Sequence, residues 1–263
     1  MNLDLTGKLA LVSGSTAGIG YAIAETLARE GARVIVNGRT ERAVDAAVER
    51  LTSATGGTVL GFAGDLASAE AADAVGTRHP DVEILVNNLG IFEAKPFESI
   101  TDADWRRFFD ANVLSGVRLA RLYLPGMKRR NWGRIIFISS ESAVQIPVEM
   151  IHYGMTKTAQ LAVARGLAEA VAGTGITVNS ILPGPTKSRG VDDYVTALAK
   201  STGQTFEAFE RDFFSKVRPT SLIKRFATPT EVATLVAYIA SPLASATTGA
   251  ALRVDGGVIK SAF

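Results

Sequence analysis

The sequence predicts an α/β fold, namely an open, doubly wound, mainly parallel seven-stranded sheet with helices on both faces. Short β-branched runs alternate along the chain with longer stretches of helical character. Most of the runs are almost continuously hydrophobic, as expected for strands that helices cover on both sides. No internal repeat, low-complexity tract or Pro/Gly-rich linker interrupts the alternation. We therefore expect one domain over residues 1–263.

The elements follow from these two patterns. The hydrophobic runs predict strands over 9–13, 33–37, 59–63, 84–87, 134–139, 177–182 and 251–254. The stretches between them predict helices over 19–29, 42–52, 67–75, 102–128, 152–172 and 230–240. Residues 187–225 break the alternation, and a loop of this length in a compact domain is usually functional or mobile. This segment carries eight Lys/Arg against five Asp/Glu, which we interpret as the solvated surface of a substrate lid rather than a dedicated anion site.

Composition excludes several classes of function. The net charge is only +2, from 28 basic and 26 acidic residues, so no nucleic-acid or acidic partner is indicated. The chain has no cysteine, which excludes disulfides, thiolate nucleophiles and Cys-based zinc sites. With two histidines we predict no metal site. Neither a signal peptide nor a membrane-spanning run is present, so we expect a cytoplasmic enzyme without membrane contact.

A glycine-rich turn joins the first predicted strand to the first helix. It reads Gly14-Ser15-Thr16-Ala17-Gly18-Ile19-Gly20. Glycines let a backbone turn tightly and approach a pyrophosphate, and a helix N-terminus supplies free N–H groups and a favourable dipole. The spacing differs from GxGxxG, so an ordinary βα turn is the alternative. Its position at the first βα junction favours a dinucleotide site.

Cofactor selectivity is indicated after the second strand. NAD-selective sites place an acidic side chain there to bind the ribose hydroxyls. This chain instead has Gly38 and Arg39, and a guanidinium fork pairs well with a 2′-phosphate. We predict a preference for NADP(H). If Arg39 is only solvated, mixed use of NAD(H) and NADP(H) follows.

Tyr153 and Lys157 are four residues apart and therefore share one face of the predicted helix. A phenol has an ordinary pKa of about 10, too high for ready proton exchange near neutrality. An ammonium about 4 Å away would contribute about 4 kcal/mol at an effective dielectric of about 20, enough to lower that pKa. The pair predicts an acid/base device, although Y-x-x-x-K also occurs by chance in helices.

Ser140 follows the fifth strand, so its hydroxyl is expected at the carboxyl edge of the sheet, where it can donate to a substrate carbonyl oxygen. A serine nucleophile is the competing interpretation, but no histidine is suitably placed. His152 adjoins Tyr153 and would point to another face of the helix. We interpret it as structural or substrate-lining.

Together these features resemble the short-chain dehydrogenase/reductase family, in its compact single-domain branch with a Rossmann-type sheet. The resemblance extends from Gly7 to Gly257. It rests on the glycine turn and on further matches at Asp65-Leu66, Asn87-Asn88-Leu89-Gly90, Asn112, Ser140, Tyr153, Lys157, Pro183-Gly184 and Val254-Asp255-Gly256-Gly257. Two positions depart from the family pattern. Ser13 replaces the usual Thr, and Leu89 replaces a small Ala.

The resemblance implies that Tyr153 exchanges a proton with the substrate oxygen, Ser140 holds that oxygen, Lys157 tunes Tyr153 and binds the nicotinamide ribose, and Asn112 links the site to solvent. It implies a homotetramer formed through the helices over 102–128 and 152–172. The cofactor-binding set is Gly14, Ser15, Thr16, Gly18, Ile19, Gly20, Arg39, Asp65, Leu66, Asn88, Gly90, Tyr153, Lys157, Pro183, Gly184 and Thr186.

The substrate is expected to be a small carbonyl compound or alcohol. Glu141, Gln145 and Met150 are predicted to contact it, and Val144 and Ile146 to help shape the pocket. The main prediction is an NADP(H)-dependent enzyme that interconverts a carbonyl and a secondary alcohol. A 3-oxoacyl-(acyl-carrier-protein) reductase, an NAD-dependent sugar or alcohol dehydrogenase, and a cofactor-binding regulator without catalysis remain as alternatives. A nucleotide-sugar epimerase or dehydratase fits less well, because such relatives usually carry a larger C-terminal substrate domain.

Overall fold

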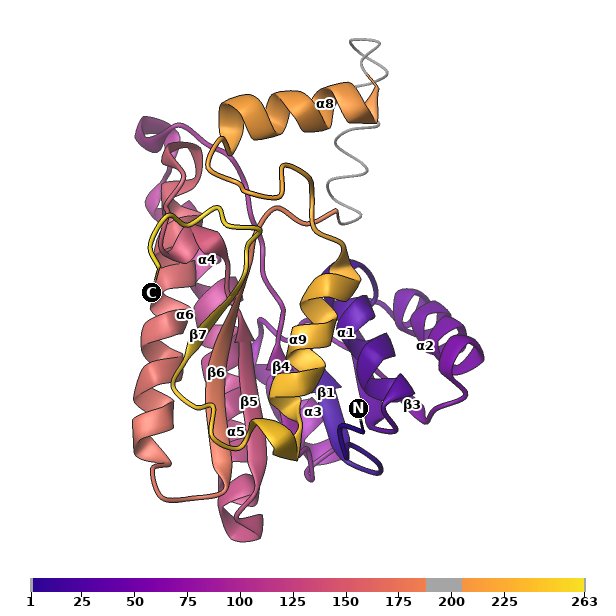
Figure 1. Cartoon of the computed structure of the whole chain (residues 1–263). Coiled ribbons are helices and arrows are strands. Elements are labelled where there is room, and N and C mark those ends of the chain that lie inside the picture. The colour runs from indigo at the N-terminus through magenta and orange to yellow at the C-terminus, as the bar shows by residue number, and fades with distance from the viewer. Residues whose placement is uncertain (1, 188–204, 263) are drawn as a thin grey trace.

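A computed structural model describes residues 2–187 and 205–262 of the chain. One parallel sheet of seven strands forms its centre, in the order β3-β2-β1-β4-β5-β6-β7 (Figure 1). The strands are β1 (Leu9–Val12), β2 (Arg33–Gly38), β3 (Val59–Ala63), β4 (Ile84–Asn87), β5 (Gly133–Ile138), β6 (Ile176–Pro183) and β7 (Ala251–Val254). The predicted doubly wound α/β fold is confirmed.

The strand order reverses at β1. Successive crossovers add β2 and then β3 on one side of β1, while β4 pairs with β1 on its other side, with Ala10 opposite Ile84. The helices that follow β1 and β4 therefore lie on opposite faces of the sheet. Ligands of open α/β sheets bind at such a switch point.

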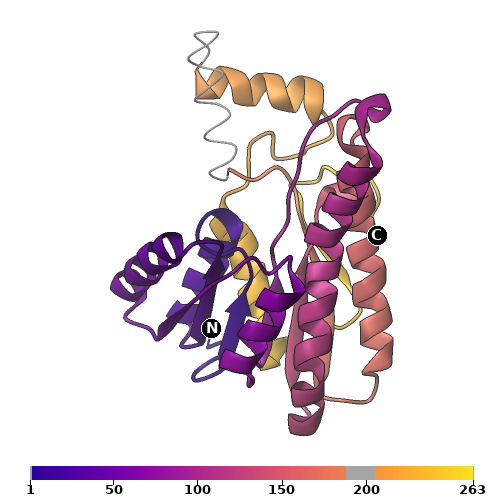
Figure 2. The same cartoon turned by 180° about the vertical axis from the view of Figure 1, so that it is seen from behind.

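Helices cover both faces of the sheet. They are α1 (Gly18–Arg29), α2 (Glu41–Thr55), α3 (Ala69–Arg78), α4 (Asp102–Phe109), α5 (Ser115–Arg130), α6 (Ile151–Ala170) and α9 (Pro229–Ala240). Helix α8 (Phe206–Asp212) lies beyond the carboxyl ends of the strands instead (Figure 1). On one face, α1, α2 and α9 bury Ile23, Leu51 and Val236 in one hydrophobic core. On the other, α3, α5 and α6 enclose a second core that contains Val75 and Leu119. Figure 2 shows α5 and α6 side by side on this second face.

The strands and helices lie where the hydrophobic pattern predicts them, with ends that shift by a few residues. The predicted helix over 102–128 differs more. It consists of α4, a π-helical turn over Asp110–Leu114 and α5, which run on as one continuous helical segment. A capping box between Thr101 and Asp104 fixes its start. A π turn inserts a residue into a helix and is frequent at functional sites, and this one carries Asn112.

The predicted lid segment needs correction in its described part. Residues 188–204 lie outside the described residues. Beyond them the chain is not a loop, because it forms α8 and a π-helical turn over Phe213–Val217. Its aromatic side chains pack together rather than lying singly on a solvated surface, and Phe209 stacks on Phe226 with 6.2 Å between the ring centroids. No helix in the described part of the chain is both long and apolar enough to span a bilayer.

Candidate active site

The glycine turn has the geometry that only glycine supplies without strain. Gly14 and Gly18 have φ angles of 61° and 59°, in the left-handed region. A Cβ on Gly20 would lie 2.4 Å from Asn88 Nδ2 and 2.5 Å from the carbonyl oxygen of Gly14. A side chain at these positions would strain or block the turn, so the backbone forms an open cradle at the end of β1.

Two asparagines brace this cradle. Asn88 Nδ2 donates to the carbonyl oxygens of Ser13 and Gly14 at 2.9 and 3.0 Å. Asn37 Oδ1 accepts from the Gly14 N–H at 3.0 Å. The Ser13 hydroxyl in turn accepts from the N–H groups of Asn88 and Leu89, so the hydroxyl kept at this departure from the family pattern has a structural use. The bracing by Asn37 was not foreseen from the sequence.

The N-terminus of α1 opens toward the cradle. Its N-cap residue is Ala17, which has no side chain to cap the first N–H groups, and Thr16, Gly18 and Ile19 are only partly buried beside it. Uncapped N–H groups and the helix dipole favour an anion. The cradle and the helix end therefore fit the pyrophosphate of a dinucleotide.

Ser15 belongs to the interior of the turn. It is fully buried, its N–H and hydroxyl donate to the carbonyl oxygens of Asn37 and Val12, and its Oγ accepts from the Asn37 N–H. These bonds show how Ser15 shapes the turn, while a direct contact with the cofactor stays a prediction.

The structure also explains why Gly38 follows the second strand. A Cβ on Gly38 would lie 2.5 Å from Thr16 Cγ2, so the position where NAD-selective sites carry an acid has little room for a side chain. Arg39 is exposed directly beside it. A phosphate on the adenosine ribose would meet an exposed guanidinium here.

The remaining predicted cofactor residues line the same edge of the sheet. Asp65 is exposed at the end of β3, and its carboxylate accepts from the Ala67 N–H at 3.0 Å, whereas Leu66 is fully buried. Pro183 ends β6, and the Thr186 hydroxyl donates to the Gly184 carbonyl oxygen at 2.9 Å. Leu89 packs against the second core, which accommodates its extra bulk.

Ser140, Tyr153 and Lys157 converge at the carboxyl end of β5. Lys157 Nζ lies 5.6 Å from the centroid of the Tyr153 ring, and its ammonium donates to the Ile138 carbonyl oxygen at 2.9 Å. The Ser140 hydroxyl oxygen accepts from the Ser142 N–H at 3.1 Å. Phe92 lies edge-on to Tyr153, with 6.5 Å between the ring centroids. A phenol, a hydroxyl and an ammonium thus face one small volume.

Burial has the largest effect on the pKa values of Tyr153 and Lys157. It raises the pKa of Tyr153, and the Glu141 carboxylate raises it further, whereas the Ser140 hydrogen bond and Arg218 act in the opposite direction. Burial also lowers the pKa of Lys157 to about 8. The sequence predicted a lowered pKa for the Tyr153 phenol, whereas in the structure of the chain alone this pKa is raised. The prediction was wrong in sign because it considered the charge of Lys157 and left out the desolvation of the phenol.

Asn112 holds the loop after β4 against the site. Its Oδ1 accepts from the Ile91 N–H at 2.7 Å, and its Nδ2 donates to the Ile91 carbonyl oxygen and to Thr156 Oγ1. Gln160 Nε2 donates to the backbone carbonyl oxygen of Asn112 at 2.6 Å. A Cβ on Gly90 would lie 3.3 Å from Asn112 Oδ1 and 3.4 Å from Lys157 Nζ. A side chain at position 90 would therefore crowd the ammonium.

The predicted substrate residues differ in their surroundings. Glu141 is buried, and its carboxylate accepts from the Ser140 hydroxyl at 2.5 Å and from Arg218 Nε at 3.3 Å. Gln145 is exposed, with its amide 3.4 Å from Thr220 Oγ1, and Met150 is partly buried at the start of α6. The contribution of Arg218, from the described end of the lid segment, was not foreseen from the sequence.

His152 is structural. It is fully buried, and its ring packs on Phe108 with 4.0 Å between the centroids and lies edge-on to Trp105. Within residues 2–187 and 205–262, neither ring nitrogen has a hydrogen-bond partner. Burial lowers its pKa. A serine nucleophile activated by this histidine is therefore excluded.

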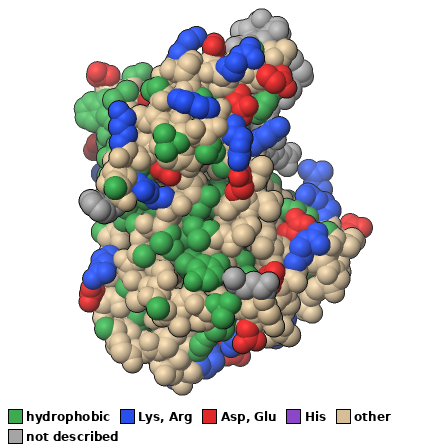
Figure 3. All heavy atoms as spheres, in the orientation of Figure 1, with side chains coloured by type: hydrophobic (Ala, Val, Ile, Leu, Met, Phe, Trp, Pro, Cys, Tyr) green, Lys and Arg blue, Asp and Glu red, His purple; other side chains and the backbone are tan. Residues whose placement is uncertain are grey.

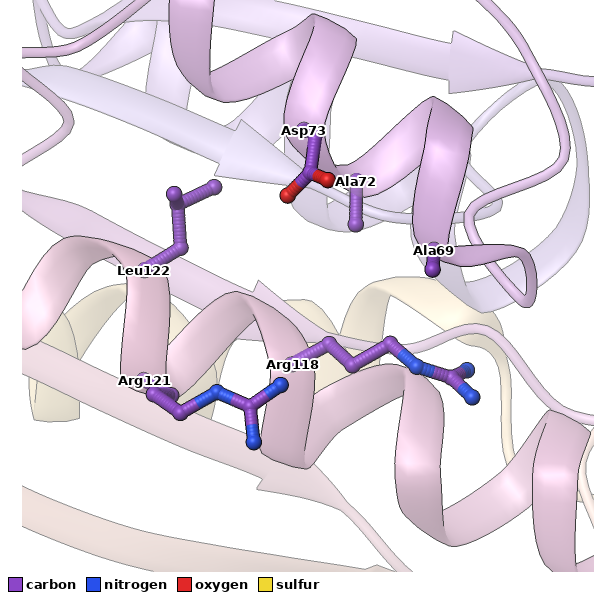
Figure 4. A pocket seen from close by; sticks show the side chains of 6 residues that line it. All are labelled: Ala69, Ala72, Asp73, Arg118, Arg121 and Leu122. Carbon is purple, nitrogen blue, oxygen red and sulfur yellow. The ribbon is translucent and has the colours of Figure 1, made fainter.

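A separate pocket lies between α3 and α5. Figure 4 shows it lined by Ala69, Ala72 and Asp73 on α3 and by Arg118, Arg121 and Leu122 on α5. Arg118 Nη1 donates to the Ala67 carbonyl oxygen at 2.6 Å. None of the residues that line this pocket belongs to the predicted catalytic set.

A glycine turn at the switch point of a parallel sheet, combined with a Ser-Tyr-Lys group at the carboxyl edge of the same sheet, is typical of dinucleotide-dependent oxidoreductases. A family model described as "Enoyl-(Acyl carrier protein) reductase" matches residues 14–259. The chain belongs to the short-chain dehydrogenase/reductase family.

Three relatives illustrate the range of similar proteins. "Uncharacterized oxidoreductase YvaG" of Bacillus subtilis is 47% identical, over 100% of both chains. D-beta-hydroxybutyrate dehydrogenase of Cupriavidus necator is 34% identical, over 96% of this chain and 98% of its own length. The solved structure of L-sorbose reductase from Gluconobacter frateurii, complexed with NADPH and L-sorbose, has a TM-score of 0.94 at 33% identity, over 99% of this chain and 100% of that chain.

Proposed function

We propose that this protein is an NADP(H)-dependent oxidoreductase that interconverts a carbonyl and a secondary alcohol, with Tyr153 as its general acid and base. The observation that carries the proposal is the convergence of Ser140, Tyr153 and Lys157 at the carboxyl end of β5. The uncapped N-terminus of α1 follows β1 of the same parallel sheet. A reduced nicotinamide bound there would supply the hydride. The chain supplies position and a proton.

Tyr153, Ser140 and Lys157 each have a separate role in the proposed reaction. Tyr153, whose raised pKa keeps it protonated at neutral pH, gives its proton to the carbonyl oxygen as the alcohol forms. The Ser140 hydroxyl donates a hydrogen bond to that oxygen and holds it near the phenol. The Lys157 ammonium lies close to Gly90 and would bind the nicotinamide ribose. The role of Asn112 in a proton relay stays a prediction.

Selectivity for NADP(H) follows from Gly38 and Arg39. No acid stands where it would repel a 2′-phosphate, and an exposed guanidinium stands beside that place. Two similar structures support the choice, since L-sorbose reductase was solved with NADPH and a putative gluconate 5-dehydrogenase from Beutenbergia cavernae with NADP. A 7α-hydroxysteroid dehydrogenase solved with NADH keeps some use of NAD(H) open.

A 3-oxoacyl-(acyl-carrier-protein) reductase is the second candidate. The reductase FabG of Aquifex aeolicus is 31% identical over 98% of this chain, and the lid segment carries an excess of basic residues that would suit an acidic carrier protein. The burial of Arg218, one of these basic residues, in an ion pair weakens that charge argument.

The predicted homotetramer remains a prediction. Its expected contact helices, α5 and α6, lie side by side on the outside of the sheet (Figure 2). Hydrophobic side chains also gather on the opposite face of the molecule, around α9 and β7 (Figure 3). Tyr238 in α9 and Leu243, just after α9, are both exposed. Light scattering on the purified protein measures the mass directly, and a monomer at micromolar concentration would contradict the prediction.

A substrate panel tests the proposed function. Ketones, ketoses and 3-oxoacyl thioesters are each mixed with the protein and with NADPH or NADH, and the loss of absorbance of the reduced cofactor is followed. We expect carbonyl-dependent oxidation of NADPH. Oxidation with thioesters alone would favour the second candidate. Tight cofactor binding without turnover of any carbonyl would indicate a regulator.

A further inference from the structure

The catalytic scheme leaves one charged group of the site without a use. Glu141 follows Ser140 directly in sequence, and its side chain is only 7% exposed. One carboxylate oxygen, Oε2, accepts the Ser140 hydroxyl at 2.5 Å, and the other, Oε1, accepts from Arg218 Nε at 3.3 Å. A buried carboxylate in direct contact with the serine that must hold the substrate oxygen requires an explanation.

Arg218 stabilises the buried Glu141 carboxylate. Its side chain is 10% exposed and pairs with Glu141, and Arg218 Nη1 lies 3.4 Å from Oε1 of the partly exposed Glu149. Buried charges persist in proteins when they are paired and hydrogen-bonded. The pair thus keeps a negative charge beside Ser140, and it joins the described end of the lid segment to the catalytic edge of the sheet.

The position of the Ser140 proton creates a conflict. A serine hydroxyl has one hydrogen to donate, and here that hydrogen points to Glu141 Oε2. To hold a substrate carbonyl, the hydroxyl must turn its hydrogen to the carbonyl oxygen. The Ser142 N–H keeps the Ser140 oxygen in place during that rotation. Oε2 then loses its donor, and a buried acceptor without a donor is costly.

We propose that a hydroxyl group of the substrate, on the carbon next to the carbonyl, replaces Ser140 as the donor to Glu141 Oε2. This inference rests on the proposed function and narrows its substrate to α-hydroxy ketones, including ketoses, with the vicinal diol as product. In an α-hydroxy ketone the carbonyl oxygen and the hydroxyl oxygen are separated by about the length of a hydrogen bond. Ser140 Oγ and Glu141 Oε2 are separated by a similar distance, 2.5 Å. The carbonyl oxygen can therefore accept from Ser140 while the hydroxyl donates to Oε2. One substrate thus satisfies both groups at once.

The same contact disfavours other substrates. An oxo acid brings a second carboxylate next to Glu141, while Arg218 is already engaged in the ion pair. A 3-oxoacyl thioester offers Oε2 no hydroxyl donor at all. A plain ketone leaves Oε2 without a donor once Ser140 has turned. Glu141 is therefore a specificity-determining residue that would touch the substrate.

Two ketones of equal size test the inference. Hydroxyacetone and butan-2-one differ only by OH in place of CH3, and acetoacetate and an acetoacetyl thioester represent the disfavoured classes. With NADPH, we expect kcat/KM for hydroxyacetone to exceed that for butan-2-one by about tenfold to a hundredfold, the value of one hydrogen bond to a charged group. Equal or better turnover of any of the other three compounds overturns the inference and leaves the proposed function standing.

Variants assign the preference to Glu141. E141Q removes the charge at constant shape and should cut the ratio of kcat/KM for hydroxyacetone to that for butan-2-one at least severalfold. The double variant E141L/R218M replaces the buried pair by apolar side chains and should abolish the preference. E149Q alters the other carboxylate near Arg218 and should leave the preference unchanged.

The outcomes separate three explanations. An equal loss for both ketones in E141Q would mean that Glu141 only positions Ser140, which overturns the recognition of a hydroxyl. An unchanged preference in both E141Q and E141L/R218M overturns it as well. If no carbonyl compound oxidises NADPH in the wild-type protein, the proposed function fails first and the inference fails with it.

Discussion

Asn112 Nδ2 lies 2.9 Å from Thr156 Oγ1, a contact that ties the π-helical turn between α4 and α5 to helix α6 one turn before Gln160. Thr156 Oγ1 also donates to the Tyr153 carbonyl oxygen at 2.7 Å. Asn112 also bonds Ile91 in the loop after β4, so its side chain connects that loop to the helix that carries Tyr153. We therefore predict that substitution of Asn112 lowers both the free energy of unfolding and kcat.

Asn112→Ala removes three side-chain hydrogen bonds and leaves the Ile91 N–H and C=O without their partners. We expect a loss of about 2–4 kcal/mol in the free energy of unfolding, measured in urea, together with a lower kcat. Thr156→Val removes only the hydroxyl that Asn112 contacts and should cost less. A fully stable and active Asn112→Ala protein would disprove the bracing role.

The glycine turn gives a matched pair of substitutions. Gly20→Ala places a methyl group 2.4 Å from Asn88 Nδ2 and 2.5 Å from the Gly14 carbonyl oxygen, so we expect a cost of about 1–3 kcal/mol in stability and weaker NADPH binding. Gly166→Ala, on the exposed side of α6, meets nothing within 4 Å and should be neutral or stabilising by up to about 1 kcal/mol. Equal stability and NADPH affinity in the two variants would contradict the cradle.

Arg39 predicts cofactor selectivity. Arg39→Asp should reduce the ratio of kcat/KM for NADPH to that for NADH by about tenfold or more, because a guanidinium contact to phosphate is lost and a repulsive charge gained. Arg33→Asp changes an exposed arginine at the start of β2, the strand that ends just before Arg39, and serves as the control. If this ratio is unchanged in Arg39→Asp, Arg39 does not determine cofactor selectivity.

His152 predicts acid sensitivity. Burial lowers its pKa in the folded protein below the ordinary value of 6.5, so the unfolded chain binds the proton more readily. The stability that neutral His152 allows is therefore complete well above pH 6.5 and is lost as the pH falls through that value toward the folded-state pKa. Urea unfolding from pH 8 to pH 5 measures this loss, which His152→Phe should reduce. The same pH dependence in His152→Phe would assign the loss to other groups.

Much of the fold could be predicted because its signals are local. Buried parallel strands are nearly continuous apolar runs, and the glycine turn lies directly between a strand and a helix. Ser140, Tyr153 and Lys157 could be placed because each stands at a strand end or near a helix start. The family resemblance then put them in register with the turn.

The missed features depend on contacts between distant residues. Arg218 is 77 positions from Glu141, and nothing in the charge count of residues 187–225 marks which of its cations is buried. The π-helical turn at Asn112 follows the same hydrophobic pattern as an α-helix. The sign of the Tyr153 pKa shift required the burial of the phenol, which sequence spacing does not give.

The central claim is that Tyr153 moves the proton, and Tyr153→Phe tests it most directly. Loss of the phenol hydroxyl should lower kcat by about 10²–10⁴-fold, the range of general acid catalysis. The dissociation constant for NADPH, measured by fluorescence titration on the same protein, should change by less than about threefold. Turnover at the wild-type rate by Tyr153→Phe, with NADPH bound equally well, would contradict the account.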